Sequence, residues 1–485
     1  MPEDTLLYQL VRDNLEEFLA LTREKGRGLP LYVEDEFREY LRCGVLQYGF
    51  SRIRCNDCGD EHLLPFSCKK RGFCPSCCGR RMAEQMIHLS DEVFPTVPVR
   101  QWVVTIPPPL RYIVSTNRRL QQYVHRVIIQ EISGFYTNNA GGKAITAPKP
   151  GSITFIQRFG SALNLNWHLH ILFADGIWFR NGKSKVTFRK IPPPAWSDTR
   201  QVLTRITRRI IHQLEKRGIV TPQQLWIKPQ TEPLLEEHPA FASAKEASAG
   251  YFSAFGERAG RPVRFIGKGY GYEGEAPKVK SDQNMTLNGF SLHCATRVKA
   301  NDRKGLERLI MYVARPPLST NRLSLTADGN VLYEFKRPFS DGRTHVLFSP
   351  VEFLEKLAAL VPLPWFNQVK YNGVFAPNSP FRKEVVPAPE QETPGSGDEE
   401  DESPEKVGNN KYLWAILLKR VFNIDMKKCS LCGGSMRFIS VIRDRGVIRR
   451  ILEHLEIPTT PPDEKVRGPP EALDLTYHDM NESYL

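Results

Sequence analysis

The sequence predicts an α+β protein with a central antiparallel sheet, preceded by a small zinc-binding module and interrupted by a largely helical insertion. Three observations lead to this fold class. Residues 51–81 are rich in Cys, Gly and Pro, which excludes a regular helix there. Short β-branched and aromatic runs such as 101–106 indicate strands. Apolar residues at helical spacing return at 197–218 and 302–313, so helices and strands are mixed along the chain.

The composition is that of a globular protein long enough for about two to four domains. The chain has 485 residues, of which 41% are hydrophobic and 25% charged. No apolar run reaches the length that spans a membrane, and the first residues lack the basic start and apolar stretch of a secretion signal. We therefore expect a cytoplasmic protein without a membrane partner.

The net charge of +13 is spread unevenly. Residues 384–410 hold nine acidic side chains and one lysine, so the rest of the chain is more basic than the total suggests. A strongly basic body favours a polyanionic partner, because each neutralised phosphate releases condensed counterions. Charge alone does not separate DNA from RNA or from an acidic membrane surface.

The N-terminal part is expected to consist of a helical segment, 1–50, and a zinc-binding domain, 51–95. Val11, Leu15 and Leu19 are spaced to share one side of a helix. In the domain that follows, two C-x2-C pairs indicate metal ligands rather than disulfides, since no secretion signal precedes them.

Four thiolates at this spacing predict one tetrahedral structural zinc ion, because a closed site leaves no position for a substrate. The four cysteines are Cys55, Cys58, Cys74 and Cys77. Four buried free cysteines are the alternative. The loop between the pairs carries Lys69, Lys70 and Arg71, which form either a DNA-binding surface or a merely solvated basic face.

Two histidines on a predicted strand form the second constellation. Strands are expected at 101–106, 152–159 and 164–174, and residues two apart on a strand point to the same face. His168 and His170 therefore project together and form a metal site that needs one more ligand, or they are ordinary histidines of a sheet.

Tyr312 lies near the end of the helix predicted at 302–313. It either borders the apolar stripe of that helix or acts as a nucleophile. Arg308 and Arg315 lie close to it in the sequence. Guanidinium groups can hold a phosphate for attack by a phenol, provided that the phosphate is polarised or the phenol deprotonated.

The remaining segments are assigned by composition. Residues 181–287 contain a basic helix at 197–218 and are expected to be a largely helical insertion that grips DNA. The acidic stretch 384–410 is expected to be a disordered linker. The C-terminal module, 411–485, contains Cys429 and Cys432, half of a zinc knuckle for which the sequence leaves metal binding open. The oligomeric state is open as well.

In this order the motifs resemble the HUH (His-hydrophobic-His) rolling-circle transposases of the insertion sequence ninety-one family. Several long matches in sequence order are more specific than any single motif. The resemblance extends over most of the chain, through 66–77, 101–107, 155–170, 289–293, 306–309, 312–317, 341–345, 373–378 and 429–434.

The resemblance implies an HUH nuclease domain in two parts, 96–180 and 288–383, that cuts and rejoins single-stranded DNA in a prokaryotic cell. His168 and His170 would hold Mg2+ or Mn2+, and Tyr312 would attack the scissile phosphate. The products would be a 5′-phosphotyrosine and a free 3′-OH, with no need for ATP. The partners implied are single-stranded DNA at the transposon ends and target DNA.

The sequence departs from the family pattern near the tyrosine. Arg308 stands four residues before Tyr312, where some members have a second tyrosine, so this chain is expected to use one. Pro316 stands four residues after it, where other HUH transposases have the third metal ligand, and its side chain cannot ligate. We therefore expect Gln157 to be the third ligand. Asn372 occupies a position where many relatives would have histidine.

Two other functions remain open at this stage. One is a zinc-dependent DNA-binding regulator without catalysis, in which the two histidines and the tyrosine are structural. The other is a metal-dependent nuclease that activates water instead of a tyrosine. A covalent protein–DNA adduct would distinguish either of them from a tyrosine transposase.

Overall fold

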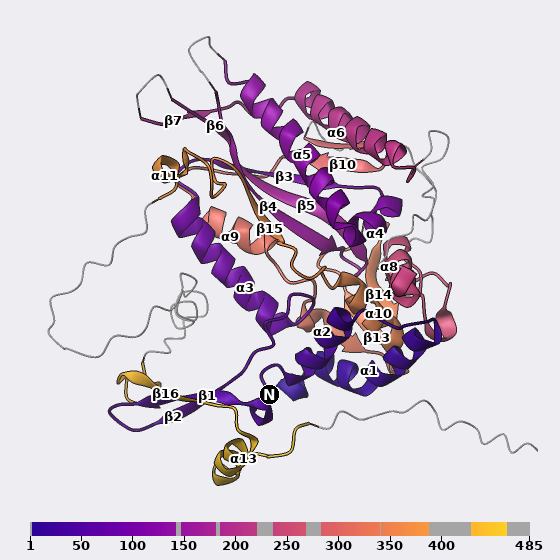
Figure 1. The fold of residues 1–485 in the computed structure, drawn as a ribbon, viewed down its shortest axis with the longest axis vertical. Helices are drawn as coiled ribbons and strands as arrows, with labels where there is room; N and C mark the ends of the chain where they lie inside the picture. The colour runs from indigo at the N-terminus through magenta and orange to yellow at the C-terminus, as the bar shows by residue number, and fades with distance from the viewer. Residues whose placement is uncertain are drawn as a thin grey trace, which may run out of the picture.

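A computed structural model describes residues 2–141, 147–180, 185–220, 236–267, 283–339, 341–387 and 428–462. Helices cover an antiparallel central sheet in the upper half of Figure 1, and a second layered body and a small lobe lie below it. The predicted α+β class with antiparallel sheets is confirmed. Within these ranges, no helix combines the length and the apolar character needed to cross a membrane.

The central sheet has the strand order β15-β4-β5-β3-β10-β9, with β11 also paired to β3. All of its described pairings are antiparallel. Its middle strands are buried on both faces, so their polar side chains, such as Arg100, Gln157 and His168, lie inside the protein. The strands are β3 (Val99–Thr105), β4 (Gly151–Phe159), β5 (Leu165–Ala174), β9 (Asn284–Leu287), β10 (Phe290–His293), β11 (Arg297–Val298) and β15 (Val369–Gly373).

Alternate residues of β5 enter different cores. Leu169 and Ile171 pack under α4 (Pro108–Thr116), α5 (Arg118–Asn138) and α6 (Trp196–Lys216). Leu172 points to the other face, which α3 (Pro75–Ile87) and α9 (Arg303–Val313) cover. After α3 the chain continues in a π-helical stretch, His88–Val93. The two histidines of β5 therefore face the helix that carries Tyr312.

A buried ion pair fixes the end of β5. Asp175 is fully buried and accepts from Arg100 Nε at 2.9 Å and from Arg297 Nε at 2.8 Å. Tyr136 adds a third bond from its hydroxyl, at 3.3 Å. Asp175 directly follows β5, and its partners Arg100 and Arg297 lie on β3 and β11. The carboxylate therefore fixes the register of these three strands. The turn at Gly176 leads into the ribbon of β6 (Gly176–Phe179) and β7 (Thr187–Lys190).

The second body combines helices with a sheet of order β12-β13-β14-β8. Phe18, Phe37, Phe241 and Phe353 share its apolar core. Its helices are α1 (Leu6–Glu24), α2 (Leu31–Arg42), α8 (Pro239–Gly250) and α10 (Pro350–Leu360), and its strands are β8 (Arg264–Gly267), β12 (Leu323–Leu325), β13 (Val331–Glu334) and β14 (Arg343–Phe348).

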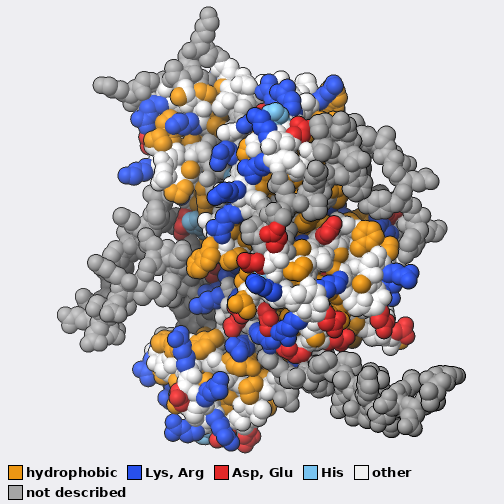
Figure 2. Space-filling model, turned by 45° about the vertical axis from the view of Figure 1, so that its right-hand side comes forward, with side chains coloured by type: hydrophobic (Ala, Val, Ile, Leu, Met, Phe, Trp, Pro, Cys, Tyr) orange, Lys and Arg blue, Asp and Glu red, His pale blue; other side chains and the backbone are white. Residues whose placement is uncertain are grey.

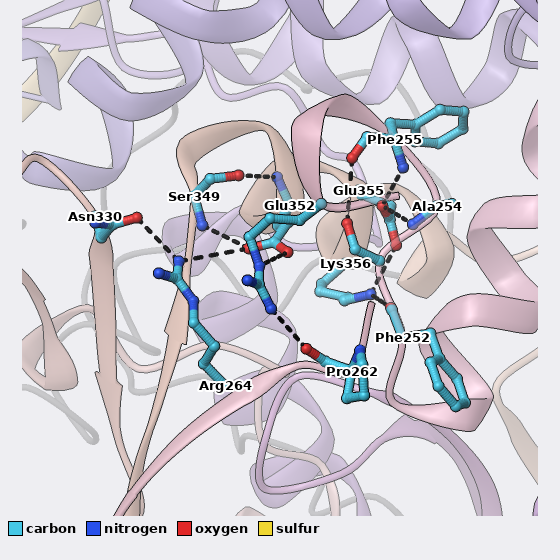
Figure 3. A network of polar contacts seen from close by, with 12 residues as sticks. Phe252, Ala254, Phe255, Pro262, Arg264, Asn330, Ser349, Glu352, Glu355 and Lys356 are labelled. Atoms are coloured by element: carbon cyan, nitrogen blue, oxygen red, sulfur yellow. Dashed lines mark hydrogen bonds and ion pairs between the residues drawn. The ribbon is translucent and has the colours of Figure 1, made fainter. Parts of the chain in front are cut away.

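A polar network attaches α10 to the loop before β8 (Figure 3). Glu355 is fully buried, accepts from the Ala254 amide at 2.7 Å and pairs with Lys356 at 2.7 Å. Glu352 forms a capping box with Ser349 at the start of α10 and also pairs with an arginine of that loop. At the other end of α10, the Leu360 carbonyl accepts from Arg158 of β4 at 2.9 Å, which joins this body to the central sheet.

The described parts of 181–287 contain helices α6 and α8 and also strands β7, β8 and β9. Helix α6 packs against α5, and β9 forms an edge of the central sheet. After α11 (Arg382–Val385), most of the predicted acidic linker, 388–410, lies outside the described residues, as do 411–427 and 463–485 of the C-terminal module.

The lobe at the bottom of Figure 1 joins segments that lie far apart in the sequence. A three-stranded sheet of order β16-β1-β2 places a C-terminal strand beside the hairpin of the N-terminal domain. The elements are β1 (Phe50–Cys55), β2 (Glu61–Pro65), β16 (Met436–Ile442) and α13 (Arg445–His454).

Candidate active site

Two imidazoles stand side by side on β5, as the two-residue period predicts. The Nε2 atoms of His168 and His170 are 3.1 Å apart, and the side chains are almost completely buried. His168 directs its Nδ1 to the Asn166 carbonyl at 2.7 Å, and His170 directs its Nδ1 to Gln101 Nε2 at 2.6 Å. The two Nε2 atoms are thus the ones that remain for a shared ligand.

Both histidines are neutral at neutral pH. Burial lowers the pKa of His168 to about 4, and the positive charge of Arg315 acts in the same direction. Burial also lowers the pKa of His170 well below its ordinary value, and the neighbouring His168 adds to this. A neutral imidazole keeps a nitrogen lone pair, which is the form that binds a metal ion.

Gln101 determines which nitrogen of His170 is free. When its amide nitrogen donates to Nδ1 of His170, the ring proton sits on Nε2 and points at His168. Ligation by both Nε2 atoms requires the His170 proton on Nδ1, and Gln101 then accepts it through its amide oxygen. Gln101 thus contacts the His170 nitrogen that lies away from His168, and sequence reasoning did not identify this contact.

Gln157 lies beside the histidines. It pairs directly with His168 across β4 and β5, so the two side chains share a face. Its amide nitrogen donates to the Val313 carbonyl at 2.6 Å, at the end of the tyrosine helix. Its Oε1 is buried and has no hydrogen-bond partner among the described atoms. A buried acceptor without a donor costs free energy, so a bound cation fits this position.

His293 lies on the same face, two strands away. It pairs with Val103, which in turn pairs with His170. Residues directly opposite in antiparallel strands share a face, so a third histidine borders the site. His293 lies in 289–293, one of the stretches that carry the family resemblance, but no role was predicted for it.

Tyr312 stands over the histidine pair. Its ring lies 5.7 Å from the ring of His170 and nearly perpendicular to it. Leu309, Ile310 and Val313 bury the apolar side of α9, whereas the Tyr312 side chain is 42% exposed. The guanidinium of Arg315 lies 4.7 Å from the centre of the tyrosine ring. The phenol is thus held at the edge of the face that carries the two histidines and stays open to solvent.

A cavity of about 760 Å³ begins at Tyr312. Four cations line it, together with the aromatic rings of Phe159, Tyr312 and Tyr333. The cations are Arg315, Arg322, Lys336 and Arg337. Sequence reasoning found Arg315 and missed the other three, because Arg322 ends a single 3-10 turn and Lys336 and Arg337 lie in an irregular segment, where spacing says little about direction.

The other predicted DNA contacts lie elsewhere. Arg308 is exposed on α9 but does not line the cavity. Lys69 and Arg71 are exposed in the loop before α3, and Lys70 is partly exposed beside them. Basic side chains clearly outnumber acidic ones over the upper part of the face drawn in Figure 2.

The cysteines form two clusters instead of the one that was predicted. Cys74 and Cys77 gather with Cys43 and Cys68, with sulfur–sulfur distances of 3.4 to 3.8 Å. A tetrahedral zinc ion with four thiolates would place its sulfurs about 3.8 Å apart. Cys74 caps α3, and Cys43 ends α2, so this cluster lies where two helices meet.

The prediction that both C-x2-C pairs share one zinc ion is therefore wrong. Cys55 ends β1 and Cys58 lies in the turn that follows, and they contact Cys432 and Cys429 instead. Spacing identifies a pair of ligands but does not reveal which pairs meet in the fold. Cys68 lies between the two pairs in the sequence and is a further possible ligand that the spacing of the pairs does not place.

Comparisons with known proteins agree with this arrangement. A family model described as "Transposase zinc-binding domain" matches residues 11–106, and one described as "Putative transposase" matches residues 151–383. A relative from Pseudomonas savastanoi pv. phaseolicola, "Transposase for insertion sequence element IS801", is 21% identical over 434 residues, which is 86% of each chain. No solved structure matches significantly.

The chain belongs to the insertion sequence ninety-one family of transposases. It has the N-terminal zinc-binding domain of that family, and the Cys43 cluster lies entirely inside the matched range. The second matched range of the transposase contains Gln157, both histidines of β5 and Tyr312. Cys429 and Cys432 lie beyond both ranges.

Proposed function

We propose that this transposase nicks and rejoins single-stranded DNA, with Tyr312 as nucleophile and Mg2+ or Mn2+ at His168, His170 and Gln157. One observation carries the proposal: the exposed phenol stands over the histidine pair at the mouth of a basic, aromatic cavity. The three metal-binding side chains share one face of the sheet, and the partnerless Gln157 oxygen fits a cation.

A divalent cation bound there would polarise the scissile phosphate and stabilise the charge that develops on it. The protein supplies the remaining functions. Burial keeps both imidazoles neutral, and the bond from Gln157 to the Val313 carbonyl ties the metal-binding face to the helix of Tyr312. Arg315 lies next to the phenol, where its guanidinium can hold the phosphate for attack.

The reaction exchanges one phosphodiester for another. The Tyr312 oxygen forms a bond to phosphorus, the bond from phosphorus to the 3′ oxygen breaks, and the phenol proton leaves as the 3′ oxygen gains one. The 5′ end of one strand is then joined to the tyrosine. A later 3′-OH reverses the step, so the strands are rejoined without an external energy source.

The cavity favours a single strand over a duplex. Unpaired nucleotides bind where an aromatic ring can stack on a base and cationic side chains follow the backbone, and the exposed Tyr312 ring and the four cations of the cavity provide both. Tyr333 is almost fully buried against the cavity wall, and Arg322 lies over its ring at 4.9 Å. The carboxyl end of α9 thus opens onto a surface suited to unpaired nucleotides.

A denaturing gel tests the nucleophile. The probes are 3′-end-labelled single-stranded oligonucleotides tiled across the ends of the element that encodes this transposase, incubated with Mn2+. We expect a slow-migrating covalent adduct with wild type and none with Tyr312→Phe. Tyr333→Phe is the matched control, since it removes another cavity hydroxyl and should retain the adduct. Cleavage without any adduct would indicate a water-activating nuclease, and binding without cleavage a regulator.

Calorimetric titration with Mn2+ tests the metal site separately. We expect His168→Ala and His170→Ala to abolish binding and Gln157→Leu to weaken it by about tenfold or more. Gln157→Glu keeps an oxygen ligand and is expected to bind at least as tightly as wild type. Equal binding by wild type and Gln157→Leu would remove Gln157 from the ligand set.

A further inference from the structure

Four cysteines from opposite ends of the chain meet in the lower lobe. The Sγ atoms of Cys55, Cys58, Cys429 and Cys432 all lie within 4.8 Å of one another. The closest pairs are Cys55–Cys432 at 3.5 Å and Cys58–Cys429 at 3.6 Å, and the latter two residues are 371 positions apart in the sequence. These separations are close to the ~3.8 Å between sulfurs around a tetrahedral zinc ion.

The two halves have matching backbone geometry. The Cys55 amide donates to the carbonyl five residues later at 2.7 Å, and the Cys429 amide does the same at 2.8 Å. The amide two residues after each of these cysteines donates to its sulfur, in both cases at 3.4 Å. A glycine with positive φ, Gly59 or Gly433, follows the second cysteine of each pair. Each half is thus a metal-binding knuckle, and the second one comes from the C-terminus.

Charge also favours a cation. Asp60 Oδ2 lies 3.6 Å from Cys429 Sγ. Cysteine binds zinc as the thiolate, and four thiolates beside a carboxylate would repel one another without a positive ion, so the zinc-bound form of this cluster suits a cation. A disulfide would use two sulfurs and leave two, whereas here all four are mutually close and all are free.

The surroundings of the four cysteines bring the two ends of the chain together. Strand β16 pairs antiparallel with β1 from Ile442 opposite Phe50 to Met436 opposite Cys55. Phe50 and Leu46 also pack against Ile448 and Leu452 of α13 in a small apolar cluster. Figure 1 shows β16 and α13 against the β1–β2 hairpin at the bottom of the molecule. The cluster is small, so a metal ion would contribute much of the stability of this joint.

We propose that Cys55, Cys58, Cys429 and Cys432 bind a second zinc ion, which fastens residues 428–462 to the N-terminal domain. The matched zinc-binding range, 11–106, holds only half of this site, and the C-terminal segment completes it. The ion is structural, since four thiolates fill its coordination shell.

Zinc content of the purified full chain, measured by inductively coupled plasma mass spectrometry, tests the site. We expect two zinc ions per wild-type chain and one in the double variant Cys429→Ser/Cys432→Ser. The matched control is Cys294→Ser, a buried cysteine in neither cluster, which should retain both ions. One ion in fully loaded wild type, or two in the double variant, would overturn the proposal.

Hydrogen exchange on the same proteins tests the joint. We expect the amides of β16 to exchange at least tenfold faster in the double variant, while those of β5 and α9 keep their protection. The preserved protection shows that the variant is folded. Cys432→His, which retains four zinc ligands, should restore both the metal and the protection of β16. Unchanged exchange in β16 would show that no ion holds the segment in place.

Discussion

Each of the two cysteine clusters consists of four thiols, but the clusters lie in different parts of the molecule. The Cys43 cluster uses ligands within one N-terminal stretch, and three of its four cysteines are buried in the core that contains α1, α2 and α10. The Cys55 cluster takes half of its ligands from the far end of the chain, and Cys58 and Cys432 are exposed. The first cluster stabilises a core, and the second joins a segment to it.

The first cluster also reaches the active site through α3. Cys74 caps this helix, and Ala83, Met86 and Ile87 at its other end pack against Leu309 of the tyrosine helix. The zinc-binding domain is therefore a support for α9 as well as a separate module. In the part of the chain that the structure describes, the lobe of β1, β2 and β16, which carries the second cluster, lies away from the central sheet (Figure 1).

The largest expected difference is in global stability. Cys74→Ser removes a ligand that is 2% exposed and leaves three thiols in an apolar core without their metal. We expect it to lower the free energy of unfolding by about 4 kcal/mol or more. Cys429→Ser is expected to change the main transition by less than about 1 kcal/mol, since its cluster holds only 428–462.

Thermal unfolding of both variants, purified with zinc and followed by circular dichroism, measures this difference. Equal melting temperatures for the two variants would contradict the conclusion that the Cys43 cluster stabilises the core and the Cys55 cluster only attaches residues 428–462. A loss of stability in Cys429→Ser as large as that in Cys74→Ser would show that the C-terminal segment belongs to the main core.

The same contrast explains what the sequence could and could not predict. The positions of residues within a single strand or helix were predictable from the spacing of apolar residues. This spacing placed His168 and His170 on one face of a strand and Tyr312 near the end of an amphipathic helix. Which cysteine pairs share a site depends on the tertiary fold, so spacing alone paired them wrongly. Cys43 was missed because a single cysteine has no spacing to recognise.

The cavity illustrates the same limit. Lys336 and Arg337 follow β13 in an irregular segment, where no repeat tells which way a side chain points. Gln157 was proposed as a ligand because Pro316, at the family's ligand position, cannot ligate and Gln157 lies on the strand before the histidines. Its partnerless oxygen and its bond to the Val313 carbonyl became visible only in three dimensions.

The second expected difference is the rate of zinc release. Two cysteines of the Cys55 cluster are exposed, whereas the Cys43 cluster has no exposed cysteine. We expect a chromogenic chelator in excess to remove zinc in two phases, with the first at least tenfold faster. The fast phase should be absent from Cys429→Ser/Cys432→Ser. A single phase in wild type would mean that exposure does not distinguish the two sites.

A smaller effect is expected from the apolar contacts that accompany the second cluster. Leu452 of α13 is fully buried against Phe50 and Leu46. Leu452→Ala should cost about 2–3 kcal/mol in the docking of the C-terminal segment, and hydrogen exchange in β16 should rise accordingly. The main melting transition should not move. The matched control, Leu455→Ala, changes a leucine that is 47% exposed and should leave both measurements unaltered.

The smallest effect is expected at Cys78, which tests where the first cluster ends. This residue directly follows Cys77 and is buried, but its sulfur is not in the cluster. In the first turn of α3 neighbouring side chains point about 100° apart, so Cys78 turns away from the ion that Cys77 binds. We expect Cys78→Ala to retain the full zinc content and to lose about 1 kcal/mol of stability, the contribution of a small buried side chain. Cys68→Ala removes a thiol of the same size that belongs to the cluster, and it should lose one zinc ion. If Cys78→Ala lost zinc and Cys68→Ala kept it, the fourth ligand of the first cluster would be Cys78 instead of Cys68.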